Sequence, residues 1–493
     1  MMERMLQETT ARCPENTSII YEGQKLSYDE LNRYVEALAH YLEGLGIRKD
    51  DKVAVMLGNC PEFIISYFAV LRLGAVAVTL SAMSTSYELG HLLENCEAKA
   101  LITQDSFARR FHAVRETLPA CRHLITTTGL NPGSPFHEII QSGSVVADPP
   151  VLQGDDPAVM IYTAGLTGKP LGAVLTYNNL ATQAVLLRTI FNGTEDDRSL
   201  AVIPLYHSFG AACNMLSPLC AGAAVVLLDR FTMEGIFTTI QKERVTYIAA
   251  VPRLYMGMLF HEKLKEFDLS SLRFAITGGS TMPPELFAEF KKHIGIQVLE
   301  GYGLTETSPC CIFSLPGKQQ KPGSIGTVLP GVEAKVLDDT GSEVASGVVG
   351  ELVVLGNVVM QGYYRDEAAT AQVIRDGWLH TGDLAYMDED GYFFLVGVKK
   401  RMIITSGFNV YPREVELILN MHPAVAESKV VGEKDLMRGE IVKALIVRKP
   451  GFDTDEKEII QHCRIYLSAY KVPREVVFVA NLESTTSQQA VGA

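Results

Sequence analysis

The sequence predicts an α/β protein with a large, multi-layer amino-terminal domain of mostly parallel sheets plus a β-rich subdomain, and a small α+β carboxyl-terminal lobe. Between residues 53 and 277, short apolar runs alternate with helical or looped stretches. Strands separated by helices need crossover connections, which give parallel pairing. From residue 328 onward, alternation and frequent Gly are typical of β structure, and the segment after residue 398 is long enough for a separate lobe.

Apolar spacing predicts the individual elements of the large domain. Leu31, Val35, Leu38 and Leu42 recur at helical intervals, and the apolar run at residues 61–73 also predicts a helix. Compact apolar runs predict strands at residues 53–57, 75–80, 201–204, 224–228, 247–251 and 274–277, followed by β-rich segments at 328–336, 350–355 and 392–396.

A domain boundary is predicted at residues 397–401, where a Lys-Lys-Arg cluster separates two strand-like runs. We therefore assign residues 1–398 to the large domain and residues 399–493 to the small one. Within the small domain, the spacing predicts a helix at 412–420, an extended segment at 429–431, a strand at 441–447 and a helix at 456–467.

Composition excludes several classes of protein. The formal net charge is −13, and an acidic chain repels phosphate backbones, so nucleic acid is not expected as a partner. The nine cysteines include no CxxC pair, which argues against a structural zinc site and favours the reducing cytoplasm. The amino terminus has no secretory-signal pattern. The apolar stretch at 63–83 contains Arg72 and Gly74, so we expect a buried helix and strand there rather than a transmembrane segment.

The strongest local motif is Tyr-Thr-Ala-Gly-Leu-Thr-Gly-Lys-Pro-Leu-Gly at residues 162–172, directly after an apolar run. A phosphate cradle needs such a loop, because glycines let backbone N–H groups approach while hydroxyls and an ammonium donate hydrogen bonds. Pro170 stands where a Walker-type P-loop requires Ser or Thr. A Gly-rich turn is more often structural than not, so the motif alone leaves both interpretations open.

Three further segments follow: Pro-Leu-Tyr-His-Ser-Phe-Gly at 204–210, Gly-Tyr-Gly-Leu-Thr-Glu at 301–306 and Thr-Gly-Asp at 381–383. Each has a structural explanation when taken singly. His207 and Tyr302 fit a protein core, Glu306 fits the first turn of a helix, and Asp383 fits a turn. These separate explanations would leave the order of the four segments as a coincidence.

In this order and at these separations, the four segments resemble the adenylate-forming superfamily of acyl-CoA synthetases, peptide-synthetase adenylation domains and beetle luciferases. The resemblance extends over nearly the whole chain, and residues 204–230 are closest in style to fatty acyl-CoA synthetases. Supporting stretches lie at 350–352, 360–364, 377–378, 411–416, 422–423 and 470–473. The resemblance implies an acid–thiol ligase in which ATP activates a carboxylic acid as an acyl-adenylate before transfer to coenzyme A.

The resemblance also implies which residues bind the nucleotide. It assigns a phosphate loop, the glycine turns beside it, an aromatic ring against the adenine and a carboxylate that accepts hydrogen bonds from the ribose hydroxyls. The matching positions are, in chain order, Thr163, Gly165, Thr167, Gly168, Lys169, Gly279, Tyr302, Gly303 and Asp383.

The catalytic positions are implied in the same way. Thr305 matches a hydroxyl that contacts phosphate, and Glu306 matches the Mg²⁺-side carboxylate, in agreement with the preference of Mg²⁺ for oxygen ligands. His207 matches the residue beside the acyl carboxylate, where an imidazole orients or gates. Lys400 falls at the hinge about which the small domain rotates between the two half-reactions, and Gly407 in the loop that this rotation brings toward the thiol channel. A homodimer is compatible with the sequence.

The chain departs from the family pattern at positions that bear on ATP. It has Ala164, Leu166 and Leu171 where the family usually has Ser, a hydroxyl residue and Lys. Residues 397–398 read Gly-Val in place of Asp-Arg. The family's final Lys, which bridges the acyl carboxylate and the α-phosphate, is replaced by Gln489 in our alignment.

Two functional hypotheses follow. The first is an ATP-dependent carboxylate–CoA ligase for a fatty or other hydrophobic acid, because the residues after His207 are apolar or small and no acid is placed to hold an amino acid's ammonium. The second is a relative that binds nucleotide or acyl-adenylate and is impaired in adenylation, because a lost charge-assisted donor costs roughly 10²–10³ in rate. A luciferase-like function has no feature in its favour.

Overall fold

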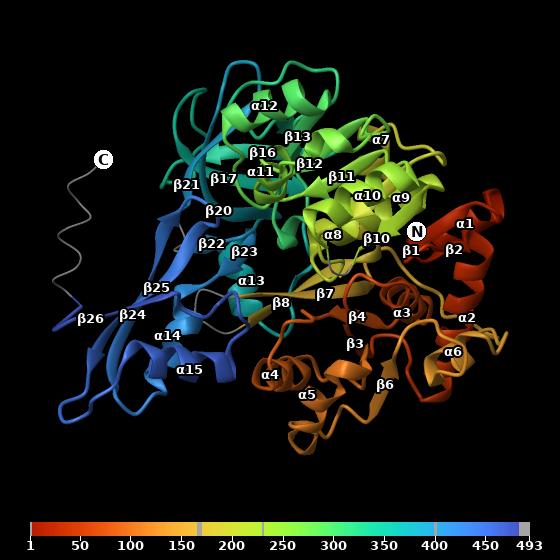
Figure 1. Cartoon of the computed structure of the whole chain (residues 1–493), viewed down its shortest axis with the longest axis horizontal. Coiled ribbons are helices and arrows are strands. Elements are labelled where there is room, and N and C mark those ends of the chain that lie inside the picture. The colour runs from red at the N-terminus through yellow and green to blue at the C-terminus, as the bar shows by residue number, and fades with distance from the viewer. Residues whose placement is uncertain (1, 165–169, 229–230, 399–401, 483–493) are drawn as a thin grey trace.

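The computed structural model describes residues 2–164, 170–228, 231–398 and 402–482. Within them lie two large sheets flanked by helices and two smaller sheets, with the carboxyl-terminal lobe, in blue, at one side of the molecule (Figure 1). Five predicted site residues lie outside the described residues: Gly165, Thr167, Gly168, Lys169 and Lys400. Gln489 lies outside them too.

The first sheet has seven strands, and its five central and distal strands pair in parallel, as predicted for strands that alternate with helices. Its strands, in spatial order, are β18 (Gly362–Tyr363), β8 (Pro170–Thr176), β7 (Pro157–Ala164), β4 (Val76–Thr79), β3 (Lys52–Met56), β5 (Ala100–Gln104) and β6 (His123–Thr127). Helix α3 (Pro61–Arg72) is buried along its whole length, which confirms the predicted buried helix. Among the described residues, no helix has the length and apolar character needed to cross a membrane.

Helix α2 (Tyr28–Gly44) shows how local sequence sets an element. The Ser27 hydroxyl accepts a hydrogen bond from the Glu30 N–H, and the Glu30 carboxylate accepts one from the Ser27 N–H, which forms a capping box. The apolar stripe predicted from its spacing, which includes Leu31 and Val35, is fully buried. A matched cap and apolar face therefore both specify this helix.

The second sheet has nine strands in the described residues and is also mainly parallel. Its strands, in spatial order, are β15 (Thr327–Val328), β14 (Ile312–Phe313), β13 (Gln297–Tyr302), β12 (Phe274–Thr277), β11 (Tyr247–Ala250), β9 (Arg198–Ala201), β10 (Ala224–Leu227), β1 (Thr17–Tyr21) and β2 (Gln24–Ser27). One face packs against α10 (Met233–Glu243), α11 (Pro252–Leu259) and α12 (Pro284–Ile294). The other face packs against α7 (Tyr177–Ile190).

Two strand predictions need correction. The strand predicted at 201–204 is β9, and it ends at Ala201. After Ala201 the chain bonds to a side chain instead of a strand: Asn59 donates to the carbonyls of Ala201 and Ile203 and accepts from the Leu205 N–H. The segment predicted at 328–336 is two strands, β15 and β16, separated by a turn.

The remaining helices connect these strands or lie at their ends. They are α1 (Met2–Arg12), α4 (Ser86–Cys96), α5 (Ala108–His112), α6 (Pro135–Ile140), α8 (Ser208–Gly210), α9 (Ser217–Ala221) and α13 (Glu367–Val373), with a π-helical turn at Ala211–Leu216. A π-helical turn inside a helix often marks a functional site. All nine cysteines are unpaired and buried, as expected from their spacing.

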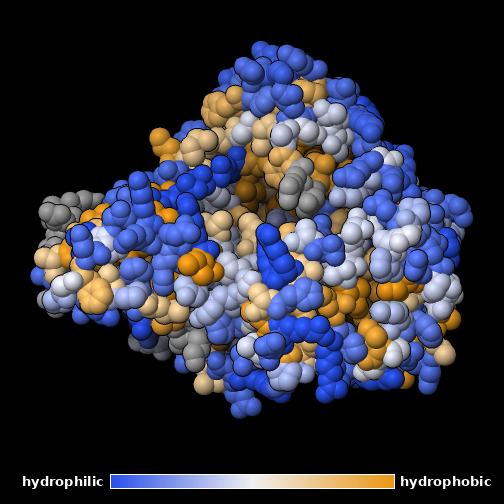
Figure 2. All heavy atoms as spheres, turned by 60° about the horizontal axis from the view of Figure 1, so that its bottom comes forward, coloured by the Kyte–Doolittle hydropathy of each residue, from blue (hydrophilic) through white to orange (hydrophobic). Residues whose placement is uncertain are grey.

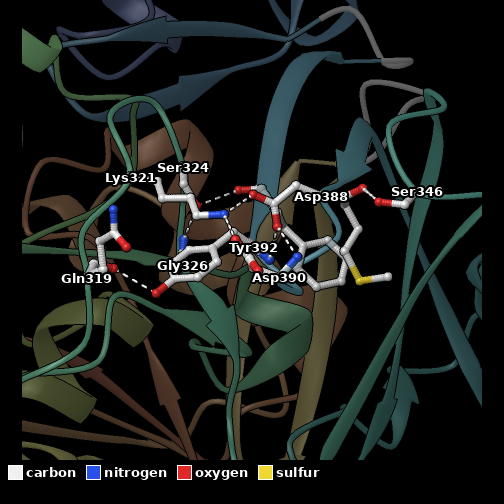
Figure 3. Close-up of polar contacts among 10 residues, drawn as sticks. Gln319, Lys321, Ser324, Gly326, Ser346, Asp388, Asp390 and Tyr392 are labelled. Atoms are coloured by element: carbon white, nitrogen blue, oxygen red, sulfur yellow. Dashed lines mark hydrogen bonds and ion pairs between the residues drawn. The ribbon is translucent and has the colours of Figure 1, made fainter.

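The β-rich subdomain is the third sheet. Its strands are β16 (Val332–Leu337), β17 (Gly350–Gly356), β20 (Trp378–Met387) and β19 (Ile374–Arg375), with β21 (Phe393–Val398) paired to β20. Lys321 ties the loop before this sheet to the β20–β21 turn, because its ammonium contacts both Asp388 and Asp390 and lies over the Tyr392 ring (Figure 3). The Tyr392 hydroxyl donates to the Gln319 carbonyl at 2.7 Å. Desolvation would raise the pKa of Asp388, but Lys321 and the backbone N–H groups of Tyr392 and Asp390 hold it below its ordinary value.

The carboxyl-terminal lobe is built on the fourth sheet. Its strands are β23 (Phe408–Val410), β22 (Ile403–Thr405), β25 (Gly439–Arg448) and β24 (Val425–Asp435), with β26 (Glu475–Phe478) paired to β25. Helices α14 (Pro412–Asn420) and α15 (Glu456–Tyr466) cover it, close to where the sequence predicts them. The last strand of the third sheet, β21, ends at Val398, and β22 of the fourth sheet begins at Ile403. The domain boundary at residue 398 stays a prediction.

Candidate active site

A cavity of about 740 Å³ lies between the large domain and the carboxyl-terminal lobe. The large domain contributes the end of β4, helix α4, strand β7, His207 and Thr305, and the lobe contributes residues 408–414 and 466–471. The space-filling view shows a recess near the middle of the molecule with hydrophobic surface inside it (Figure 2). Its walls come from the carboxyl ends of parallel strands, where α/β proteins commonly bind ligands.

Tyr302 and Asp383, which lie far apart in the chain, are in direct contact. The Tyr302 hydroxyl at the end of β13 donates to Oδ2 of Asp383 on β20 at 2.6 Å. Burial and the nearby Asp383 charge raise the pKa of Tyr302, so the phenol keeps its proton and donates it. The Asp383 backbone N–H donates to Thr381 Oγ1, which anchors the carboxylate. The structure thus brings together the two residues expected at the adenine and the ribose.

Gly303 lies in a turn that leaves no room for a side chain. A Cβ at this position would lie 1.7 Å from the Pro309 carbonyl oxygen, far inside contact distance. The Thr307 hydroxyl accepts from the Leu304 N–H at 2.8 Å and donates to the Pro309 carbonyl at 2.9 Å. This tight loop places Thr305 and Glu306 at its tip, facing the cavity side of β13.

Glu306 is held by groups from two other strands. Its Oε1 accepts from the Tyr363 hydroxyl at 2.7 Å and lies 3.5 Å from Thr163 Oγ1. One carboxylate surrounded by hydroxyl oxygens suits Mg²⁺, which usually binds through one or two carboxylates plus substrate phosphates. The described residues contain no cluster of three or more His, Cys, Asp or Glu side chains able to hold a metal ion. The donor set therefore fits Mg²⁺, which Glu306 would hold and whose charge would offset that of the substrate phosphates.

His207 is the N-cap of α8 and faces the cavity. Its Nδ1 accepts a hydrogen bond from the Phe209 N–H at 3.2 Å. Burial lowers the pKa of His207 to about 4, so the imidazole is neutral near pH 7 and carries its proton on Nε2. The side chain can then donate a hydrogen bond to an acyl oxygen but supplies no positive charge. The next residue, Ser208, has its hydroxyl 3.4 Å from that of Thr305.

Gly278 and Gly301 lie close together near Phe209, beside His207. A Cβ on Gly278 would lie 3.4 Å from the Phe209 ring and 3.1 Å from the Gly301 carbonyl oxygen. Gly279 has φ +79°, a left-handed conformation that favours glycine, and it faces Val251. The glycines therefore allow the ends of β12 and β13 to approach the start of α8.

The carboxyl-terminal lobe presents its 406–411 loop to this crevice. Gly407 has φ +85°, and a Cβ there would lie 2.6 Å from Val251 of the large domain. Beside it, the Arg253 guanidinium donates to the Ser406 hydroxyl at 2.8 Å. Phe408, Asn409 and Tyr411 line the same cavity as His207. The loop predicted to approach the thiol channel thus lies against the site in this structure.

Three of the predicted site residues line the cavity, namely Thr163, His207 and Thr305. Glu306 lies beside Thr163, Asp383 is bonded to Tyr302, and Gly279 and Gly407 both face Val251. Gly303 lies in the turn that follows β13, between Tyr302 and Thr305. Sequence reasoning missed Tyr363, which is the partner of Glu306. It also missed Tyr411, whose pKa is raised first by burial and then by the nearby charges of Glu306 and Asp383. Both lie in stretches that supported the resemblance.

Glu300 is a buried carboxyl within the site strand β13. It is 4% exposed, and its Oε1 accepts from the Met282 N–H at 3.4 Å. Burial raises the pKa of Glu300 to about 7 from an ordinary value of 4.5. The carboxyl is therefore protonated in the folded protein over a range where it is ionised in the unfolded chain.

We expect stability to fall as the pH rises from 4.5 to 7 because of Glu300. Below pH 4.5 the folded and unfolded states both bind the proton, and the stability that depends on protonated Glu300 is fully present. Above pH 7 both states have lost the proton, and the free energy of unfolding is lower by roughly 3 kcal/mol. Replacing Glu300 with Gln should remove this dependence and make the protein more stable than the wild type above pH 7. Urea unfolding midpoints at pH 5, 6, 7 and 8 test this, with the exposed Glu389→Gln as the control; equal slopes in wild type and Glu300→Gln would contradict it.

A two-domain α/β fold whose crevice joins Tyr302, Asp383, Thr305 and Glu306 defines an adenylate-forming enzyme. Residues 6–364 match the model of the AMP-binding enzyme family, and residues 414–489 match that of the AMP-binding enzyme C-terminal domain. The chain belongs to this family and is an acid–thiol ligase of the acyl-CoA synthetase class.

Relatives with established names are similar in sequence to this chain over nearly its whole length. A long-chain-fatty-acid–CoA ligase of Bacillus subtilis is 33% identical, with 98% of this chain and 92% of the relative covered. An indoleacetate–CoA ligase of Aromatoleum aromaticum is 35% identical, with 96% and 93% covered. A solved double mutant of o-succinylbenzoate CoA synthetase from Bacillus subtilis, bound to a product analogue, superposes with a TM-score of 0.85 at 29% identity, with 97% of this chain and 95% of that chain covered.

Proposed function

We propose that this protein is an ATP-dependent carboxylate–CoA ligase that acts on a fatty or other hydrophobic acid. The contact between Tyr302 and Asp383 carries the proposal, because it joins the residues expected at the adenine and the ribose, while His207 and Thr305 line one cavity. The carboxylate of the substrate attacks the α-phosphorus of ATP, which gives acyl-adenylate and pyrophosphate. A thiol of coenzyme A then attacks the acyl carbonyl, and AMP leaves.

The residues of the crevice supply positioning and charge neutralisation. Tyr302 covers the adenine, and Asp383 accepts hydrogen bonds from the ribose hydroxyls. Thr163 and Thr305 donate to phosphate oxygens, while Mg²⁺ held by Glu306 would neutralise the phosphate charge. In such reactions the protein gains rate mainly by fixing the reacting groups in line and by stabilising developing charge.

His207 contributes a neutral donor at the acyl carbonyl. Its Nε2–H can bond to the acyl oxygen while Phe408 and Asn409 of the lobe enclose the path from the lobe side. A neutral donor does not attract a second carboxylate, which suits an uncharged acyl chain. Between pH 6 and 8, an ionisation of His207 should therefore cause no change in the rate of thioester formation, because its pKa is about 4.

The substrate class rests on the apolar surroundings of His207. The Phe209 ring lies against Gly278, and the adjoining Ala211, Ala212 and Cys213 are buried. Such a wall favours an alkyl or aryl acid over an amino acid. Two of the relatives are named for acids of this kind, a long-chain fatty acid and indoleacetate.

A second candidate is an enzyme efficient only in thioester formation. The departure at Gln489 favours it, and residues of the 406–411 loop of the lobe line the cavity. Supplying coenzyme A with either ATP plus a panel of fatty and aryl acids, or with pre-formed acyl-AMP, separates the two. Acyl-CoA from both mixtures supports the full ligase, acyl-CoA from acyl-AMP alone supports the half-reaction, and none from either refutes both.

We expect Gln489→Lys to raise the ATP-dependent rate. A lysine at the family position would donate a charged hydrogen bond to the α-phosphate, worth roughly 10-fold or more. Pyrophosphate exchange into ATP measures the effect directly, with Gln488→Lys as the control for added charge. An unchanged exchange rate would mean that the tail is aligned wrongly.

A further inference from the structure

A buried ion cluster joins the carboxyl-terminal lobe to the large domain. The Lys471 ammonium lies 2.8 Å from Glu88 Oε1 on α4 and 2.6 Å from Glu414 Oε1 on α14. The Ser468 hydroxyl donates to Glu88 Oε2 at 2.6 Å. The three charged side chains are only 10–15% exposed. One residue of the cluster, Glu88, comes from the large domain, and the other members come from the lobe.

The charges in this cluster depend on one another. Burial alone would lower the pKa of Lys471, but Tyr470, Glu414 and Glu88 raise it overall. Burial would raise the pKa of Glu88, but Lys471 and the hydrogen bonds from Ser468 and Thr85 lower it. Burial and the nearby Glu88 charge raise the pKa of Glu414, so Lys471 is the shared partner of two carboxyl groups. Glu88 and Lys471 are therefore paired with each other only when the two domains are together, and a buried charge that loses its partner is costly.

On the large domain, the cluster is fixed to the site through α4. Glu88 also closes the capping box of α4, since its Oε2 accepts from the Thr85 N–H at 2.9 Å. Helix α4 follows β4, and Thr79 at the end of β4 donates to the Tyr206 carbonyl at 2.9 Å, directly before His207. A rigid path thus connects Glu88 to the acyl site.

On the lobe, two contacts connect the cluster to the loop that faces His207. Tyr470, next to Lys471, stacks on Phe408 with ring centroids 4.6 Å apart. Glu414 lies on α14, which follows β23 and its residues Phe408 and Asn409. Fixing Lys471 against Glu88 therefore fixes the position of Phe408 relative to His207.

We propose that Glu88 and Lys471 are positioning residues that hold the lobe in the thioester-forming orientation. The inference rests on the proposed function, in which the lobe rotates between the half-reactions. In the proposed reaction, adenylation takes place with the lobe rotated so that a different face meets the site, so it does not need the contact between Glu88 and Lys471. The cluster consequently favours thioester formation over adenylation, and the effect grows with the fraction of molecules in this orientation.

Glu88→Gln is the sharpest test, because glutamine keeps the capping box of α4 and leaves the Lys471–Glu414 pair inside the lobe. We expect kcat/KM for coenzyme A, measured with pre-formed acyl-AMP, to fall about 10-fold. Glu88→Lys should lower it about 100-fold by placing two ammonium groups together. Pyrophosphate exchange into ATP, which reports adenylation, should stay the same or rise in both variants.

Glu97→Gln is the matched control. Glu97 caps the other end of α4 and pairs with Arg365 of the large domain on the surface, so both half-reactions should keep their wild-type rates. The double variant Glu88→Gln with Lys471→Met should lose no more thioester activity than Lys471→Met alone, because each change breaks the same contact between Glu88 and Lys471. An unchanged thioester rate in Glu88→Gln, or an equal loss in both half-reactions, would overturn the proposal. A wild-type protein inactive in both assays would instead refute the proposed function.

Discussion

Asp383→Ala should lower kcat/KM for ATP by roughly 10²–10³-fold. A carboxylate that accepts two ribose hydrogen bonds contributes about 1.5–3 kcal/mol for each charged bond, part of which is lost to competition with water. The change also leaves the buried Tyr302 hydroxyl without its acceptor. Because acyl-AMP carries the same ribose, thioester formation from acyl-AMP should weaken as well.

Asp390→Ala is the control for Asp383→Ala. It removes a carboxylate from the same subdomain, at the exposed end of the Lys321 cluster, and should leave both half-reactions unchanged. Tyr302→Phe keeps the ring and loses only the hydroxyl, so we expect a smaller effect, about 10-fold. Steady-state kinetics with ATP as the varied substrate measure all three variants, and a wild-type KM for ATP in Asp383→Ala would contradict the assignment.

Glu306→Gln should lower kcat for adenylation by roughly 10²–10³-fold and weaken the dependence on Mg²⁺. An amide oxygen binds a hard cation less well than a carboxylate and brings no negative charge. Thioester formation from acyl-AMP should be affected less, because no pyrophosphate is present at that stage. Pyrophosphate exchange over a Mg²⁺ titration measures the first effect, and acyl-CoA formation from acyl-AMP the second.

Tyr363→Phe completes this comparison. It removes the hydroxyl that donates to Glu306 at 2.7 Å but leaves the carboxylate in place, so adenylation should fall no more than about 10-fold. If Glu306→Gln and Tyr363→Phe had the same small effect and the Mg²⁺ dependence did not move, Glu306 would be a structural residue that anchors its loop.

Apolar patterning predicted most elements of the fold because burial and periodicity are local properties of the chain. The helix at 412–420 and the strand at 274–277 agree with α14 and β12 at both ends. Strand β9 was placed three residues late, because Val202 and Ile203 are buried without being in a sheet. The Ile203 carbonyl accepts its hydrogen bond from Asn59, more than a hundred residues earlier in the sequence, and no local pattern reports such a partner.

The site was predictable where function fixes a residue in a motif, and not where a side chain acts through a distant neighbour. Tyr302 and Asp383 each lie in a motif, and the structure adds only their contact. Glu88, by contrast, reads in the sequence as a helix-capping residue, and its partner Lys471 lies 383 positions later. The roles of all the predicted site residues stay predictions, and Thr167, Lys169 and Lys400 also lie outside the described residues.

The buried cysteines have a chemical consequence for an enzyme that handles thioesters. Burial raises the pKa of Cys96 to about 11 and that of Cys121 and Cys463 to about 12, which keeps these sulfurs as unreactive thiols at neutral pH. Because all nine cysteines are buried, none is exposed to compete with the intended acceptor for the activated acyl group. A cysteine engineered on each domain surface would react selectively with maleimide dyes, so that energy transfer between the dyes could test whether the lobe rotates as proposed.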